Sequence, residues 1–148
     1  MLSHKAESKR NLLLGKQLQP MTALDEEYSD ISILTDGLLG LPSNYHCGQM
    51  LSSADPHLKI AIPRIVGMKK LKVYLVNNPK YHIILPEKVI LSSGNRELGT
   101  VVPKTYDAEQ KRAVAEFNIP SNVSGTLILT IRRDKSDRTM AIDEIEGY

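Results

Sequence analysis

Two groups of acidic residues in this sequence could act on a ligand or hold a cation. One group lies within residues 25–30, and the other lies within residues 143–146, where it alternates with apolar residues. Two carboxylates on either side of a cleft can hydrolyse a glycosidic bond, but nothing in the sequence places these two groups across a cleft. Loop carboxylates more often face water or hold a hard cation such as calcium. Calcium also takes backbone carbonyl oxygens, which the Asp36-Gly37 turn offers.

The histidines and the single cysteine form no recognisable catalytic or metal-binding pattern. His4, His46, His57 and His82 lie far apart, and none of them has metal-ligand spacing on one strand face. Cys47 follows His46 directly, and neighbours in an extended chain point apart, so the two are not expected to act as nucleophile and base. The sequence also lacks a glycine-rich phosphate loop and the HExxH, CxxC and GxSxG motifs. We therefore expect a binding protein and not an enzyme.

Length and charge narrow the possible partners. A chain of 148 residues is expected to form one domain, and its net charge of +2 is small and dispersed. Nucleic acid and anionic membrane surfaces are therefore not expected partners. No apolar run approaches the roughly 20 residues that span a bilayer. Residues 1–10 are polar, lack a signal peptide and are expected to be a flexible lead or linker before a domain at 11–148.

Apolar and polar residues alternate in short runs that turn signals separate, which is the pattern of β-strands. Two less regular runs, residues 11–16 and 31–34, are also interpreted as extended. No connection between strands has room for a helix, which excludes a parallel sheet. The sequence predicts an all-β fold, an antiparallel β-sandwich of jelly-roll type with about eight strands. The clearest expected strands are residues 57–62, 71–76, 88–92, 98–102, 112–119, 126–131 and 139–148.

Several segments, taken in order, carry a resemblance to a known family. Residues 11–16 resemble an Asn-Leu-Ala-Leu-Gly-Lys opening, and residues 28–37 resemble a Tyr-Pro-Asp and Leu-Thr-Asp-Gly pair. Residues 71–75 and 86–95 resemble a strand, proline, strand and turn, and residues 141–148 resemble a closing Ile-Asp-Glu-Ile-Glu-Val-Tyr strand. These segments are similar to those of galactose-binding-like β-sandwiches, the discoidin or coagulation-factor C-type domains. Bacterial carbohydrate-binding modules of family 32 share this fold.

The resemblance implies a structural calcium ion. In the family, the aspartate of the Asp-Gly turn and the first glutamate of the closing strand help to bind it. Those positions are Asp36 and Glu144 here, with Leu34 and nearby loop carbonyls as backbone ligands. A cation bound between the two carboxylates would hold them together, although they would otherwise repel each other. The alternative is that Asp36 only caps its turn and that Glu144 faces solvent.

The expected ligand site departs from the family's pattern, which usually includes a tryptophan soon after the Asp-Gly turn. This chain contains no tryptophan, and the loop-like residues 38–56 hold a tyrosine and a histidine in that region. Sugar binding relies on aromatic faces and on side chains that hydrogen-bond hydroxyl groups. The candidate ligand-binding residues are Tyr45, His46, Asn77, Tyr81 and His82, with Tyr106, Asn78 and Arg64 as further loop candidates.

Together these features predict a non-catalytic carbohydrate-binding or accessory module of an exported bacterial protein. Such a module would bind a glycan weakly and hold a neighbouring glycosidase domain near its polysaccharide. The location implied by the resemblance is extracellular, at the cell surface or in the periplasm. The alternative is a protein-interaction or spacer module with the same fold and no sugar site.

Overall fold

The computed structural model describes residues 2–3, 11–21, 31–35, 38–39, 51–53, 57–78, 85–109, 111–123, 125–132 and 140–148. Within these ranges the backbone consists of strands and turns apart from one short 3-10 helix, η2 (Ile31–Thr35). The predicted all-β fold class is therefore confirmed. None of the helical structure in the described ranges is long and apolar enough to cross a membrane.

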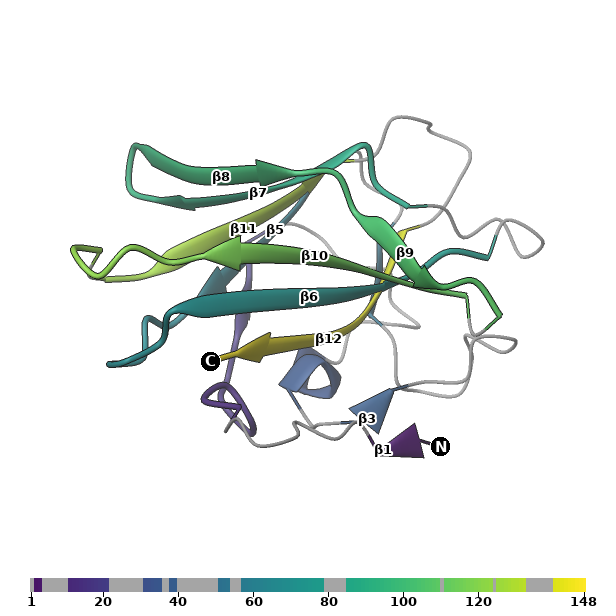
Figure 1. The fold of residues 1–148 in the computed structure, drawn as a ribbon. Coiled ribbons are helices and arrows are strands. Elements are labelled where there is room, and N and C mark those ends of the chain that lie inside the picture. The colour runs from purple at the N-terminus through teal and green to yellow at the C-terminus, as the bar shows by residue number, and fades with distance from the viewer. Residues whose placement is uncertain are drawn as a thin grey trace.

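Two antiparallel sheets stack to form a sandwich (Figure 1). In the first sheet the strand order is β4 (Leu51–Ser53), β12 (Met140–Gly147), β6 (Lys70–Val76), β10 (Arg112–Asn118) and β9 (Lys104–Asp107). In the second it is β2 (Gln19–Pro20), β5 (His57–Ile62), β11 (Leu127–Arg132), β7 (Lys88–Ser93) and β8 (Arg96–Val101). A small ribbon of β1 (Leu2–Ser3) and β3 (Leu38–Leu39) lies beside β12.

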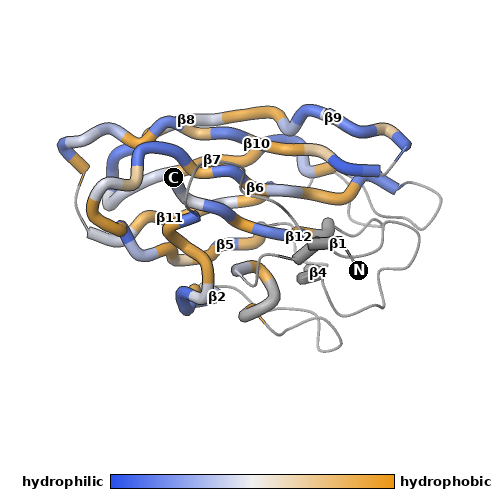
Figure 2. Tube along the Cα trace, turned by 60° about the horizontal axis from the view of Figure 1, so that its bottom comes forward, coloured by the Kyte–Doolittle hydropathy of each residue, from blue (hydrophilic) through white to orange (hydrophobic). Residues whose placement is uncertain are grey.

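The core lies between the sheets and is built from the residues on one side of each strand. Leu58, Ile60 and Ile62 of β5 have no exposed surface, and neither do Leu71 and Val73 of β6. Figure 2 shows the alternation of apolar and polar residues along these strands. The period of two therefore identified the inward faces correctly. The expected strands at 57–62, 71–76, 88–92, 98–102, 112–119, 126–131 and 139–148 are confirmed, with ends that shift by one or two residues.

Two segments interpreted as extended are not strands. Residues 12–15 form a turn that ends at Gly15, whose φ of 74° favours glycine. Residues 31–35 form η2, in which Ile31 and Leu34 lie one turn apart and are both buried. In so short a run, apolar residues occur both two and three positions apart. Alternation alone therefore could not distinguish a strand from a 3-10 helix.

A bulge in β12 decides which of its side chains enter the core. Ile142 pairs with Leu75 and Glu144 pairs with Tyr74, so the register shifts by one residue at Asp143. Ile142 and Ile145 are three positions apart, yet both are fully buried in the core. A regular strand would place them on opposite faces. The bulge thus lets β12 contribute both isoleucines.

The bulged residue Asp143 forms a buried ion pair with Arg112 of β10. The Arg112 Nη1 atom donates a hydrogen bond to the Asp143 Oδ2 atom, and the two side chains are 4% and 0% exposed. Because β6 lies between β12 and β10 in the sheet, the pair links the two neighbours of β6. An unpaired buried ion would cost several kcal/mol, so Arg112 makes the burial of Asp143 possible.

Hydrogen bonds connect residues 11–13 to the end of β12. The Asn11 Oδ1 atom accepts hydrogen bonds from the Gly147 N atom at 3.0 Å and the Leu13 N atom at 3.1 Å. The Leu12 N atom donates to the Gly147 carbonyl at 2.6 Å. A Cβ atom added to Gly147 would lie 2.9 Å from Leu13 Cγ and closer still to Met68 Sδ. This close approach therefore requires glycine.

Removing one member of the Arg112–Asp143 pair is expected to destabilise the fold more than removing both. Asp143→Leu and Arg112→Leu should each lower the free energy of unfolding by about 3–5 kcal/mol, because the remaining charge stays buried. The double variant should lose clearly less than the sum of the single losses. Urea unfolding of the wild type, both single variants and the double variant measures this coupling. Additive losses would show that the two side chains do not depend on each other.

Gly147→Ala is expected to lower the free energy of unfolding by about 1–3 kcal/mol, because the new methyl group overpacks the core at Leu13 and Met68. The matched control is Val102→Ala, which changes a side chain that is 71% exposed. It should stay within about 0.5 kcal/mol of the wild type. Thermal unfolding of both variants makes the comparison. Equal melting temperatures for Gly147→Ala and the wild type would contradict the close approach.

Candidate functional site

The sandwich presents two opposite ends, and the predicted ligand-binding residue Asn77 belongs to one of them. At one end β6 and β11 finish, and β5, β7, β10 and β12 begin; we call it the Asn77 end (Figure 1). We call the other end the Tyr148 end, because β12 and the described chain finish there. Of the five predicted ligand-binding residues, the structure describes Asn77. The predicted residues Tyr45, His46, Tyr81 and His82 lie outside the described residues.

Asn77 is held by the backbone at the point where β6 ends. Its N atom donates a hydrogen bond to the carbonyl of Lys111 at 2.8 Å, in the turn that precedes β10. Lys111 has a φ of 58°, so a residue other than glycine adopts the left-handed backbone conformation in this turn. Asn77 is half-buried, whereas the neighbouring Asn78 is 3% exposed. Asn77 is therefore the better placed of the two to meet a ligand.

The other described candidate at this end, Tyr106, is in strand β9 and not in a loop. Its ring meets that of Tyr74 edge to face, with centroids 6.0 Å apart and an interplanar angle of 74°. Burial raises the pKa of both phenols, and for Tyr74 the charge of Glu146 raises the pKa further. Both phenols therefore remain protonated and can donate a hydrogen bond well above neutral pH. Tyr106 keeps 49% of its surface exposed.

The predicted calcium ligand Glu144 is fully buried in β12. The alternative that it faces solvent is therefore wrong. Strand β12 packs against η2, whose last residue Thr35 directly precedes the other predicted ligand, Asp36. Asp36 itself lies outside the described residues. The end of η2 is fixed, because the Thr35 hydroxyl donates to the Lys16 carbonyl at 2.8 Å and the Gly15 N atom donates to the Thr35 carbonyl at 2.7 Å.

Three carboxylates and one guanidinium are the charged groups buried among the described residues: Asp143, Glu144, Glu146 and Arg112. The Glu146 Oε1 atom accepts a hydrogen bond from the Tyr148 hydroxyl at 2.6 Å. A buried set with more negative than positive charge suits a hard cation, which prefers carboxylate and carbonyl oxygens. Glu144 is the carboxylate of this set that the resemblance assigns to calcium, and it is buried beside η2. Within the described ranges, however, no group of three or more His, Cys, Asp or Glu side chains stands ready to hold a metal.

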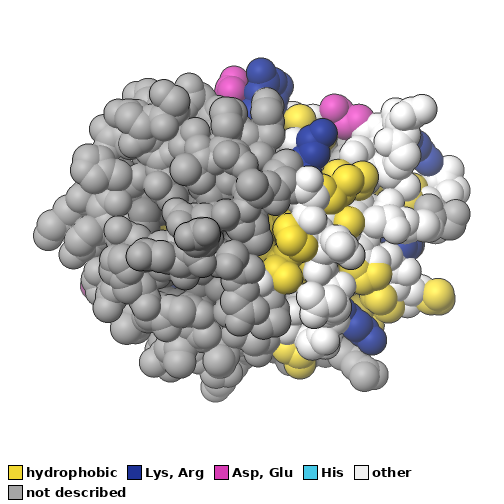
Figure 3. Space-filling model, turned by 180° about the vertical axis from the view of Figure 1, so that it is seen from behind, with side chains coloured by type: hydrophobic (Ala, Val, Ile, Leu, Met, Phe, Trp, Pro, Cys, Tyr) yellow, Lys and Arg dark blue, Asp and Glu magenta, His cyan; other side chains and the backbone are white. Residues whose placement is uncertain are grey.

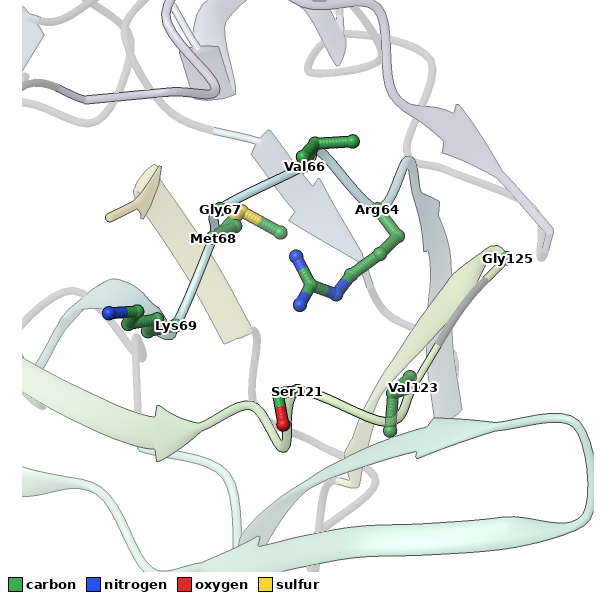
Figure 4. A pocket seen from close by; sticks show the side chains of 8 residues that line it. All are labelled: Arg64, Val66, Gly67, Met68, Lys69, Ser121, Val123 and Gly125. Atoms are coloured by element: carbon green, nitrogen blue, oxygen red, sulfur yellow. The ribbon is translucent and has the colours of Figure 1, made fainter.

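A pocket of about 350 Å³ opens at the Tyr148 end, between the loop that joins β5 to β6 and the loop that joins β10 to β11 (Figure 4). Arg64 lines this pocket, so it lies at the opposite end from Asn77. The sequence interpretation that paired Arg64 with the residues of the Asn77 end is therefore wrong. No local sequence pattern reports the end of a sandwich to which a loop belongs.

The described part of the surface shows no broad apolar face when it is seen from behind. Apolar side chains form small patches there, separated by polar side chains and by lysines and arginines (Figure 3). Apolar residues scattered in this way are normal on a protein surface. Ligand contacts on this side would therefore depend on individual polar groups and pockets.

Solved structures with the same architecture cover nearly the whole chain, although no family model and no curated protein matches it. The lectin domain of lectinolysin complexed with Lewis B antigen aligns with a TM-score of 0.62 at 12% identity, over 94% of this chain and 96% of that one. A fucose-binding module of Streptococcus pneumoniae aligns with a TM-score of 0.62 at 17% identity, over 96% of both chains. The module CBM32-1 from a family 31 glycoside hydrolase of Clostridium perfringens aligns with a TM-score of 0.56 at 15% identity, over 93% of this chain and 98% of that one.

These alignments confirm the fold that the resemblance implied. The strands of the two sheets come from nearly the whole described chain, and each alignment covers at least 94% of the chain. The chain therefore has the galactose-binding-like β-sandwich fold of fucose-binding and family 32 carbohydrate-binding modules.

Proposed function

We propose that this chain is a carbohydrate-binding module. The observation that carries the proposal is the extent of the structural likeness. Modules described as binding Lewis B antigen or fucose align over at least 94% of this chain and 96% of their own. The likeness thus extends over nearly the whole length of each of these modules.

The glycan site is proposed at the Asn77 end, with Tyr45, His46, Asn77, Tyr81 and His82 as the contacts. The side-chain amide of Asn77 can donate to one sugar hydroxyl and accept from the next, which is the pairing that adjacent ring hydroxyls offer. The tyrosine rings would cover the C–H face of the sugar, and the histidines would bond further hydroxyls. The half-buried position of Asn77 at the strand end, where its backbone is fixed, supports this assignment.

A structural calcium ion is proposed between Asp36 and Glu144. Glu144 is buried beside η2, and the described buried carboxylates outnumber the described buried guanidinium by three to one. A bound divalent cation would offset this charge and hold the residue that follows Thr35 against β12. Its role would be to fix the segment that leads into the residues 38–56, and not to contact the glycan.

The module is proposed to belong to an exported bacterial protein and to act outside the cytoplasm, next to a catalytic domain. CBM32-1 comes from a glycoside hydrolase, which supports the idea of a neighbouring hydrolase. Tethering raises the local concentration of polysaccharide around such a domain even when the module binds weakly.

The absence of tryptophan from the sequence favours the second candidate function, which is a protein-interaction or spacer module of the same fold.

Glycan binding is tested by a glycan array in calcium buffer, followed by titration of the best glycan into variants. Asn77→Ala and His82→Ala should each weaken binding about tenfold, the loss expected for one or two hydrogen bonds to a sugar hydroxyl. Asn95→Ala is the matched control, because Asn95 is an exposed turn residue at the other end. It should leave affinity unchanged. An array on which no glycan binds at millimolar concentration would favour the spacer function.

Calcium binding is tested by thermal unfolding with calcium, with magnesium and with a chelator. Saturation at a hundred times the dissociation constant should add about 2.7 kcal/mol to the stability, so the chelator should lower the melting temperature by several degrees. Glu144→Gln should remove the calcium response, whereas Glu97→Gln, an exposed control in β8, should keep it. A melting temperature that the chelator does not change would refute the calcium site.

A further inference from the structure

The pocket at the Tyr148 end has walls that the backbone holds in place. One wall is the loop of residues 63–69, where the Met68 N atom donates to the Ile65 carbonyl at 3.0 Å and Gly67 has a φ of 87°. The other wall is the loop of residues 119–126. The Ile119 N atom donates to the Lys69 carbonyl at 2.8 Å and so joins the two loops directly. The pocket therefore does not need a ligand in order to form.

The guanidinium of Arg64 points into this pocket and lies between Met68 and Ser121 (Figure 4). Its Nη1 atom donates to the Ile65 carbonyl at 2.5 Å, while its Nε atom is buried and has no hydrogen-bond partner among the described residues. None of the described residues that line the pocket is acidic. The lining thus supplies a cation and hydrogen-bond donors but no carboxylate to meet them.

The rest of the lining is apolar or small. Met68 is fully buried, Val123 is 7% exposed, and Val66 stands 96% exposed beside the glycine turn. Gly67, Gly125 and Ser121 leave room in front of the guanidinium. Lys69 also lines the pocket, and its side chain is directed away from Arg64 (Figure 4). An occupant would therefore place an anionic group on Arg64 and a C–H surface against the valines and the methionine.

We propose that this pocket binds a carboxylate-bearing sugar or a small organic acid of similar size. A guanidinium presents two parallel N–H donors that match the two oxygens of a carboxylate. A carboxylate bound there would also offer an acceptor to the Nε atom, which has none among the described residues. Ligand sites usually have volumes of roughly 300–1,000 Å³, and the volume of this pocket is near the lower end of that range. The pocket therefore suits one sugar ring and not an oligosaccharide.

This site is separate from the glycan site proposed at the Asn77 end. The two lie at opposite ends of β6, and they differ in chemistry, because Asn77 offers a neutral amide and Arg64 offers a positive charge. Apart from Arg64, the described residues that line the pocket include none of those predicted to bind calcium or a neutral sugar. The pocket can therefore be tested whether or not the module binds a neutral glycan.

The test is an NMR titration of the ¹⁵N-labelled protein with sodium glucuronate, with glucose as the neutral match and glucose 6-sulfate as a second anion. Glucuronate should shift the amide signals of residues 64–69, 119 and 121–125 at millimolar concentration. Arg64→Gln should weaken this binding about tenfold or more. Arg64→Lys should restore it only in part, because an ammonium lacks the paired donors.

Two further variants keep the test decisive if Arg64→Gln does not fold. Ser121→Leu fills the pocket from an exposed turn and should abolish the shifts, while Arg132→Gln removes one exposed positive charge at the Asn77 end and should leave them unchanged. Glucose binding as well as glucuronate, glucose 6-sulfate binding more tightly than glucuronate, or shifts that survive Ser121→Leu would each overturn the proposal.

Discussion

Strand β12 carries three carboxylates into a region closed to solvent, and the neighbouring elements are arranged to make that burial possible. Asp143 and Glu144 have no exposed surface and Glu146 is 1% exposed. Arg112 reaches across β6 to Asp143, and Tyr148 donates to Glu146 at 2.6 Å. Buried carboxylates are tolerated only with such partners, because the loss of hydration costs several kcal/mol per ion. The acidic strand is therefore a structural element first, and its carboxylates are not displayed on the surface.

The same strand connects the two ends of the sandwich. Its bulge places Ile142 and Ile145 in the core, which fixes the strand along its length. At its end, the Tyr148 carbonyl accepts hydrogen bonds from the backbone of Lys69 and Lys70, so β12 supports the loop that lines the pocket. It also packs against η2, whose last residue directly precedes the predicted calcium ligand Asp36. One strand thus supports the loop of the Arg64 pocket and the helix next to the proposed calcium site.

The strands could be predicted because burial on one face forces a period of two, as at Leu58, Ile60 and Ile62. The bulge could have been suspected from the spacing of three between Ile142 and Ile145, which no regular strand can bury on one face. The 3-10 helix was missed because five residues are too few to separate one period from another. The position of Arg64 was missed for a different reason, since the end at which a loop emerges depends on the pairing of distant strands. The burial of Glu144 also depends on tertiary packing, which the resemblance implied only indirectly.

Burial changes what the carboxylates of β12 can do. A catalytic pair must reach a substrate on both sides of the scissile bond, and the carboxylates of Asp143, Glu144 and Glu146 do not reach the surface. Both proposed sugar sites use other residues, at the two ends of the sandwich. β6 has seven residues and a strand rises about 3.3 Å per residue, so the two ends lie roughly 20 Å apart. A single sugar ring cannot span that distance, so one ring could not occupy both the glycan site proposed at Asn77 and the anion site proposed at Arg64.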